Sequence, residues 1–574
     1  MINKNQRVCR ILIFGGLFLS SIFMTSLYAQ DGPPPPPNGD AGRPGGPGTG
    51  DRPGGDGGGG PGNGGGPGGG PPLPAINNLE NAQENLQALI AELNLSAVNP
   101  QAENLPDITD KKAQLGKQLF FAKNLGGEQS AACVSCHHPT LGGGDELSLP
   151  VGVSAVNALE QSSHDLLGHG RFNGDALNNL PSVPRNSPTV FNLGLNNRAL
   201  FWDGRVERRR GGAIVTPDSP IDAQGRQLRD PNLPENTTLA AAQARFPVTS
   251  PDEMRGGFLA SDDNQSLRTE LTTRFTNSNG DFTSNWPASF VQAFGDDGVT
   301  FNRIVEAIGE YERSMVFVNN PWKAYLEGNN DALSQEQKAG AVLFFANRRD
   351  GGAGCSGCHS GQTFASNRQH LVAYPQIGPG KGNDTGANTS NDFGRENINN
   401  QADERFHFRA PSLLNIAVTA PYGHTGAYQT LEEVVAHYND PRDAINRLFS
   451  ANNNEAFSGS NAPFCQLTQI RDLMTKNNQS CEELYPDAYQ NSMAAVIHLE
   501  QARDGTVEAR APLRGRRNLS QEQISHVAAF MRALTDPCVT NRVCLEPWLI
   551  DESDRVSYPD DLPLIATDKN GSNL

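Results

Sequence analysis

The chain has 574 residues, with 61 Gly, 40 Pro and a formal net charge of −17 at pH 7. A chain of this length exceeds what one compact core accommodates, so two domains with accessory segments are expected. The acidic balance argues against a nucleic acid or an anionic membrane as partner, and it suits contact with a basic redox protein.

The first 29 residues are typical of a secretory signal peptide. Lys4, Arg7 and Arg10 precede an apolar stretch over residues 11–27, and Ala29 offers a small residue at a cleavage point. A retained membrane anchor is the alternative, but the stretch is short and a Pro/Gly tract follows it at once. Cleavage leaves a net charge of −20. We expect an exported mature protein in a Gram-negative periplasm that does not span the membrane, since no later segment is apolar over about twenty residues.

Residues 30–74 are expected to form a disordered linker. They consist mainly of Gly and Pro with scattered polar residues, and such a composition cannot bury enough apolar surface to fold. A passive spacer is the simpler interpretation, and an arm that crosses the cell wall is the alternative.

An internal repeat organises the rest of the chain, after a helix expected over residues 78–95. The pattern Gly-x-x-Leu-Phe-Phe begins at Gly116 and again at Gly340. Each copy leads to a Cys-x-x-Cys-His motif, over residues 133–137 and 355–359, and the copies lie 222 to 224 positions apart. The repeat predicts an N-terminal domain over residues 75–330 and a C-terminal domain over residues 331–574.

Helix-start signals recur along both halves, whereas the alternation typical of strands is scarce. Asp110 is a candidate cap before the first repeat, and capping boxes begin at Ser334, Thr430 and Ser520. The predicted fold class is therefore mainly α, with long irregular loops.

The Cys-x-x-Cys-His motif attaches haem: its thiols form thioethers and its His binds the iron. A thioredoxin-like pair or half of a zinc site are the alternatives for a single copy. Two copies in an exported chain instead predict two haem c groups, and each half is then a cytochrome c-like haem domain. The expected attachment residues are Cys133, Cys136, Cys355 and Cys358, with His137 and His359 as iron ligands.

The other cysteines of the mature chain form two pairs without a following His. Cys465 with Cys481 and Cys538 with Cys544 are expected to be structural disulfides, as suits an exported protein, and a reactive role is the alternative.

Further motifs follow the two sites in a fixed order. Phe201-Trp202-Asp203-Gly204-Arg205 and Ser250-Pro251-Asp252-Glu253-Met254 come after the first site, and Thr419-Ala420-Pro421-Tyr422-Gly423-His424 comes after the second. Together with Arg185-Asn186-Ser187-Pro188-Thr189 and Phe408-Arg409-Ala410-Pro411-Ser412, they give a pattern over residues 105–540 that resembles the dihaem cytochrome c peroxidase/MauG superfamily.

The resemblance implies a division of roles between the two halves. His137 would hold the peroxide-reactive haem, and His359 the haem that stores and relays electrons. Trp202 would be the bridge between them, and Glu253 the carboxylate that moves a proton to promote O–O cleavage. Without the resemblance, Trp202 reads as a core tryptophan and Glu253 as a surface carboxylate.

The resemblance also implies a calcium ion between the haems, bound through Asn186, Thr419 and Pro421. Oxygen ligands suit this hard cation, although Asn186 could equally be a turn residue.

The sixth ligand of the second haem separates the branches of the superfamily. MauG-like members carry Tyr where the peroxidase branch carries Met, and here Tyr438 takes that position. A phenolate stabilises oxidised iron, so the haem would reach high-valent states more readily. A core tyrosine is the alternative, with His437 or a nearby Met as the ligand.

The chain departs from the superfamily pattern at several points. The Gln expected after Phe-Trp-Asp-Gly-Arg is missing, and Gly423 and Thr425 stand where an aromatic or Met and an Asp are usual. Residues of about 446–516 have no counterpart and would form an insertion. His169 resembles a removable ligand of the first haem, but with a Tyr-type second haem that site is expected to be open already.

The leading interpretation is a periplasmic oxidoreductase that reduces hydrogen peroxide. Its electrons would come from a small cytochrome c or cupredoxin, or from a protein substrate oxidised through high-valent haem as in MauG-like enzymes. A dihaem oxygenase acting on an apolar substrate and a plain electron-transfer cytochrome are the alternatives. A homodimer is left open.

Overall fold

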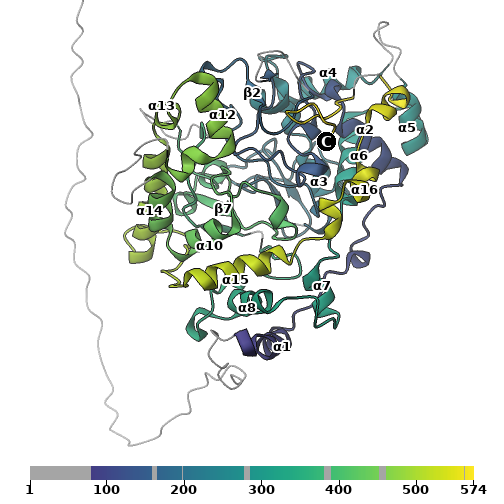
Figure 1. Cartoon of the computed structure of the whole chain (residues 1–574). Coiled ribbons are helices and arrows are strands. Elements are labelled where there is room, and N and C mark those ends of the chain that lie inside the picture. The colour runs from purple at the N-terminus through teal and green to yellow at the C-terminus, as the bar shows by residue number, and fades with distance from the viewer. Residues whose placement is uncertain are drawn as a thin grey trace, which may run out of the picture. The chain divides into compact units, whose positions relative to one another are not determined.

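The computed structural model describes residues 79–157, 165–196, 198–276, 285–366, 368–380, 390–450, 461–560 and 563–574. The expected signal peptide and linker lie outside these residues. All described residues belong to one unit that spans Gly69–Leu574 (Figure 1). None of its described helices combines the length and the apolar character needed to cross a bilayer.

The described chain is mainly helical, as the sequence predicts. The α-helices are α1 (Ala82–Leu93), α2 (Lys111–Phe120), α3 (Leu239–Gln243), α4 (Asn264–Thr273), α5 (Trp286–Phe294), α6 (Phe301–Ser314), α7 (Pro321–Leu326), α8 (Gln335–Phe345), α9 (Glu396–Asn399), α10 (Leu431–Asn439), α11 (Pro441–Phe449), α12 (Thr468–Asn477), α13 (Cys481–Leu484), α14 (Ala488–Asp504), α15 (Gln521–Arg532) and α16 (Arg542–Leu545). Long loops and short 3-10 turns connect them.

The strands are short and form three small antiparallel sheets. They are β1 (Ala155–Val156) with β2 (Phe172–Asn173), β3 (Ala199–Leu200) with β4 (Val206–Arg208) and β5 (Ile214–Val215), and β6 (Gln369–Leu371) with β7 (His407–Arg409).

The repeated glycine lets two helices cross closely in each half. A Cβ atom on Gly116 of α2 would lie 1.9 Å from the carbonyl oxygen of Ala307 in α6, and one on Gly340 of α8 would lie 1.8 Å from that of His526 in α15. Only glycine permits such an approach. The repeat therefore encodes one helix crossing twice, and each crossing precedes a Cys-x-x-Cys-His turn.

All three expected capping boxes form. Ser334, Thr430 and Ser520 each accept a hydrogen bond at the start of α8, α10 and α15. Asp110 also stands at the N-cap position of α2, but its carboxylate accepts from the backbone nitrogen of Asp107 rather than from the helix.

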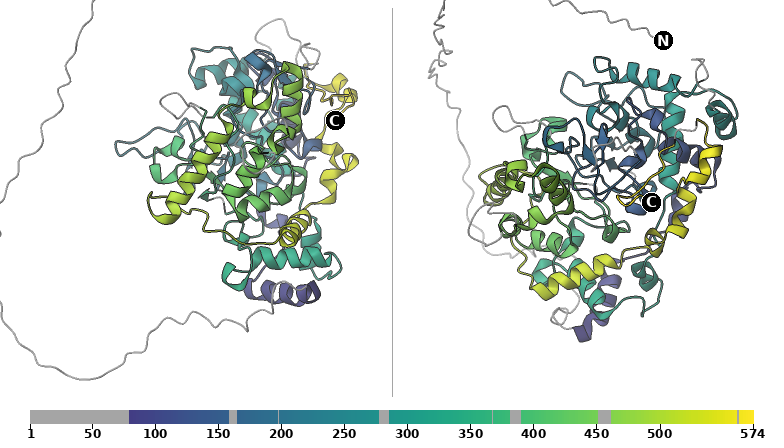
Figure 2. Two further views of the ribbon diagram at one scale, coloured as in Figure 1. Left: turned by 60° about the vertical axis from the view of Figure 1, so that its left-hand side comes forward. Right: turned by 45° about the horizontal axis from the view of Figure 1, so that its top comes forward.

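Buried apolar side chains form two large clusters. Helix α1 of the first half packs in the cluster of the second half, and the C-terminal segment packs in the cluster of the first half. The first gathers around α2 and α6, and the second around α8, α10 and α15. Helix α1 packs on the opposite side of α8 from α15 (Figures 1 and 2). The C-terminal segment returns to the first cluster, where the Leu564 nitrogen donates to Phe121 at 2.9 Å and the Tyr311 hydroxyl to the Trp548 carbonyl at 2.7 Å.

The described part of the predicted insertion docks on the first half. The Gln469 amide of α12 donates to the Leu149 carbonyl at 2.8 Å and accepts from the Leu149 nitrogen at 3.0 Å. Both expected disulfides are present, Cys465–Cys481 within this insertion and Cys538–Cys544 beside α16.

Candidate functional site

The first Cys-x-x-Cys-His motif opens onto a cavity, called the first cavity below. Cys133, Cys136 and His137 line it together with Glu253, from the turn Pro251–Arg255. The serine at the start of that turn accepts from the Glu253 nitrogen at 3.3 Å. Glu253 is therefore held in the same cavity as the motif.

The second motif opens onto a second cavity. Cys355, Cys358 and His359 line one part of it, and Tyr438 lines it from the last turn of α10. The Cys-x-x-Cys thiols of both motifs are free. Each motif thus presents two thiols and an imidazole to a largely apolar space, which is the donor set and the surrounding that a covalently bound haem requires.

Both motif histidines are held in the tautomer that binds iron. His359 Nδ1 lies 3.0 Å from the Phe364 carbonyl oxygen, and His137 Nδ1 lies 3.3 Å from that of Gly143. A carbonyl oxygen only accepts, so Nδ1 carries the proton and Nε2 keeps its lone pair. Burial lowers the pKa of each histidine to about 4, which keeps it neutral. The residues present fit a haem at each motif.

Tyr438 is a better candidate for the sixth ligand than His437. His437 Nε2 lies 2.8 Å from the Val372 carbonyl oxygen and its Nδ1 lies 2.8 Å from the Tyr428 hydroxyl, so both nitrogens are engaged. Burial raises the pKa of Tyr438 to about 12. Met531 of α15 also lines the second cavity and is the nearby Met that the sequence leaves as an alternative.

Trp202 lines both cavities. Its indole nitrogen donates to the Asn186 carbonyl at 2.8 Å, and its own carbonyl accepts from the Arg409 nitrogen at 2.8 Å. Asn186 and Arg409 also line both cavities. Asn186 of the first half thus holds the indole, and Arg409 of the second half holds the backbone of the same residue.

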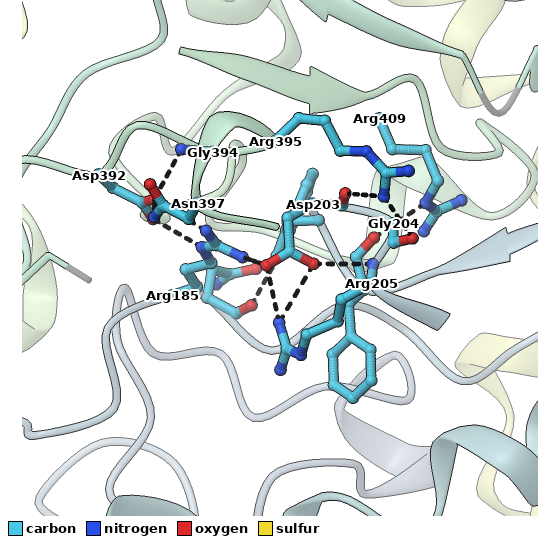
Figure 3. A network of polar contacts seen from close by, with 12 residues as sticks. Arg185, Asp203, Gly204, Arg205, Asp392, Gly394, Arg395, Asn397 and Arg409 are labelled. Carbon is cyan, nitrogen blue, oxygen red and sulfur yellow. Dashed lines mark hydrogen bonds and ion pairs between the residues drawn. The ribbon is translucent and has the colours of Figure 1, made fainter. Parts of the chain in front are cut away.

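A buried ion-pair network holds this bridge (Figure 3). Asp203, next to Trp202, pairs with Arg185 and Arg205, and Arg185 also pairs with Asp392 of the second half at 2.6 and 2.8 Å. Burial alone would raise the pKa of Asp392, but Arg185 lowers it below its usual value. Both carboxylates face charged partners, so the two halves are joined beside Trp202.

Two acidic or amide residues of the first cavity were missed in the sequence. Gln243, the last residue of α3, lines this cavity with Glu253, so an amide side chain is present there although no Gln follows Phe-Trp-Asp-Gly-Arg. Glu312 of α6 also lines it, is 3% exposed and has one carboxylate oxygen without a hydrogen-bond partner. Burial raises the pKa of Glu312 to about 8.

The three residues expected to bind calcium are part of the wall of the second cavity. Asn186, Thr419 and Pro421 all line it. The Asn186 amide nitrogen donates a hydrogen bond to the Leu147 carbonyl at 2.8 Å. The amide oxygen is then the atom of Asn186 that could serve as a calcium ligand.

His169 is not among the residues that line the first cavity. Its loop pairs with the C-terminal segment, where the Leu167 nitrogen donates to Thr567 at 2.9 Å.

Comparison with known proteins gives consistent matches. Residues 110–331 match the family "Di-haem cytochrome c peroxidase". The chain is 28% identical to cytochrome c551 peroxidase of Pseudomonas aeruginosa over 57% of this chain and 72% of that protein. It is 26% identical to the methylamine utilization protein MauG of Methylorubrum extorquens over 62% and 76%. A crystal structure of a MauG-like protein associated with microbial copper homeostasis aligns with a TM-score of 0.46 and 19% identity, over 79% of this chain and 97% of that one.

Proposed function

We propose that this chain, whose residues 110–331 match the di-haem cytochrome c peroxidase family, is an enzyme that reduces hydrogen peroxide at the His137 site with electrons that cross Trp202 from the His359 site. The position of Trp202 carries the proposal, because one side chain lines both cavities. The two haem c groups of this class would supply iron that exchanges single electrons and cleaves the O–O bond.

Glu253 and Gln243 act on the peroxide in the first cavity. The Glu253 carboxylate takes a proton from one peroxide oxygen and returns it to the other, which turns the departing oxygen into water. The Gln243 amide has a donor and an acceptor, so it orients the peroxide beside Glu253.

Tyr438 of α10 and His359 of the second motif would be the two protein ligands of the second iron. A phenolate ligand favours the oxidised metal, which suits a site that must keep oxidising equivalents until a donor arrives. This favours the MauG-like branch. The donor is then a protein substrate, or else a small cytochrome c or cupredoxin drawn to the acidic chain.

The proposed location is the periplasm. The predicted signal peptide supports it, as does the Cys465–Cys481 disulfide, since thiols become oxidised in that compartment. Asn186, Thr419 and Pro421 are the proposed oxygen donors of a calcium ion, which metal analysis before and after a chelator tests.

The first test is steady-state oxidation of a reduced small cytochrome by hydrogen peroxide, with protein that carries both haems. Rapid turnover supports a peroxidase with a redox-protein donor. Peroxide consumption that leaves the cytochrome reduced supports the protein-substrate branch. Absence of peroxide consumption overturns the proposal.

The bridge is tested with Trp202→Phe, which keeps an aromatic ring but removes the indole. Electron transfer between the two haems should slow, while both haems stay attached. Trp322→Phe is the matched control, because Trp322 is 5% exposed and belongs to the second apolar cluster rather than to either cavity. Equal transfer rates in both variants would remove Trp202 from the pathway.

A further inference from the structure

Three tyrosines and a histidine, two of them buried and two partly buried, form a group beside the second cavity, called the tyrosine cluster below. Its members are Tyr374, Tyr428, Tyr438 and His437. The Tyr374 ring lies 5.8 Å from the Tyr438 ring, 5.8 Å from the Tyr428 ring and 4.6 Å from the His437 ring, measured between centroids. The cluster thus forms a continuous aromatic path from the proposed iron ligand.

The hydrogen bonds of His437 decide which way the Tyr428 proton points. The Val372 carbonyl oxygen lies 2.8 Å from His437 Nε2 and can only accept, so Nε2 carries the hydrogen of the neutral ring. Nδ1 is then a bare acceptor, and the Tyr428 hydroxyl, 2.8 Å away, donates to it. Tyr428 is therefore a phenol paired with an imidazole base.

This pairing distinguishes Tyr428 from the other tyrosines of the path. A phenol that loses an electron becomes strongly acidic, and a neutral radical forms readily only where a base receives the proton. The Tyr374 ring contacts the ring of Tyr438, the proposed iron ligand, whereas the Tyr428 hydroxyl has an imidazole nitrogen within hydrogen-bond distance. Tyr428 and His437 are 2% and 0% exposed, so a radical there is shielded from solvent.

We propose that Tyr428 is a redox-active residue that supplies an electron to the second site, with Tyr374 and Tyr438 as the path and His437 as the proton acceptor. The inference rests on the proposed function. Hydrogen peroxide takes up two electrons and two protons and yields two water molecules. One electron leaves Tyr428 toward the oxidised second site, and its O–H proton moves to His437 Nδ1. The neutral tyrosyl radical and the imidazolium return to the starting pair when an external donor supplies one electron.

The experiment mixes the enzyme carrying both haems with one equivalent of peroxide, freezes it at short times and records electron paramagnetic resonance spectra. A tyrosyl signal should appear and should narrow when the protein is made with ring-deuterated tyrosine. Its formation should slow in heavy water, because a proton moves with the electron. If Tyr428 had only a structural role, it would give no tyrosyl signal with these responses to ring-deuterated tyrosine and heavy water.

Tyr428→Phe removes only the hydroxyl and should abolish this signal. Tyr485→Phe is the matched control, because Tyr485 is a buried tyrosine whose hydroxyl has no hydrogen-bond partner in the described structure. The signal should survive there. A signal that persists in Tyr428→Phe, or its absence in the parent enzyme while peroxide is consumed, overturns the inference.

A photo-excited ruthenium complex with an external electron acceptor separates this inference from the proposed function. It oxidises the protein without peroxide. If peroxide is not consumed, the proposed function fails. The photo-oxidation experiment with the ruthenium complex then tests the role of Tyr428 by itself. A radical lost in Tyr428→Phe supports the inference, and no such radical overturns it.

Discussion

The ring of Tyr374 occupies the space that a side chain at Gly423 would need. A Cβ atom on Gly423 would lie 2.7 Å from Cδ1 of Tyr374, closer than van der Waals contact allows. Gly423 is one of the departures from the expected motif, and the Tyr374 ring fills the volume beside it from another segment. Thr425, the neighbouring departure, donates to the Pro375 carbonyl at 2.7 Å. The two departures therefore form one arrangement that seats Tyr374 beside Tyr438.

Gly423→Ala should displace Tyr374 and destabilise the protein. Overpacking of this kind costs about 1–3 kcal/mol, and the φ of +92° at Gly423 adds a backbone penalty. Denaturant unfolding measures the sum. Gly505→Ala is the control, because its φ is +82° and no atom lies within 4 Å of its Cβ position. Equal losses in the two variants would mean that Tyr374 yields without cost.

Tyr438→Phe should leave both haems attached and change the spectrum of the second site. The ring still fills the cavity wall, but the phenol oxygen that would bind iron is lost. Optical and electron paramagnetic resonance spectra of the ferric protein report the change. Tyr422→Phe is the control, since Tyr422 also lines the second cavity. An unchanged Tyr438→Phe spectrum would remove Tyr438 from the iron and direct attention to Met531.

The sequence predicts those features that are local or repeated. The Gly116 and Gly340 repeats, the capping boxes and the two motifs are each written within a few residues, and each has the predicted structure. The resemblance adds positions such as Trp202 and Glu253, and both of these residues line the first cavity.

The features that the sequence could not predict depend on contacts between distant segments. Gln243 escaped notice because β4, β5 and a long loop separate it from Phe-Trp-Asp-Gly-Arg, yet α3 returns it to the first cavity. The one indication in the sequence was that Gln243 stands only ten residues before Glu253, close enough for both side chains to reach the same cavity. Glu312 reads as an ordinary polar residue of an amphipathic helix. The return of the C-terminal segment to the first cluster depends on packing of Trp548 and Leu564, which no local pattern reveals.

Removal of the Cys465–Cys481 disulfide should cost more stability than removal of Cys538–Cys544. The bonded residues are 16 and 6 positions apart, and the chain-entropy relation gives about 3 and about 2 kcal/mol respectively. Cys465 and Cys481 are also buried in the second cluster, so their replacement by Ala leaves a cavity. Denaturant unfolding of the two double-Ala variants gives the order. A larger loss for the shorter loop would contradict this account.

Glu312 should make the protein less stable as the pH rises. In the folded state burial raises its pKa to about 8, against an ordinary value of 4.5. Between these two values the folded state holds a proton that the unfolded chain has lost, so the free energy of unfolding falls with increasing pH. The contribution is fully present below pH 4.5 and is lost as the pH rises through about 8.

Glu312→Gln keeps the size of the side chain and removes this titration. The free energy of unfolding, measured from pH 5 to pH 8, should therefore fall less in the variant than in the parent protein, with the difference largest at the alkaline end. Glu306→Gln is the control on the same helix, because the Glu306 side chain is 46% exposed and pairs with Lys112 at the surface. Parallel pH profiles for the parent and Glu312→Gln would mean that Glu312 is already ionised in the folded enzyme, with a partner in the first cavity that holds its charge.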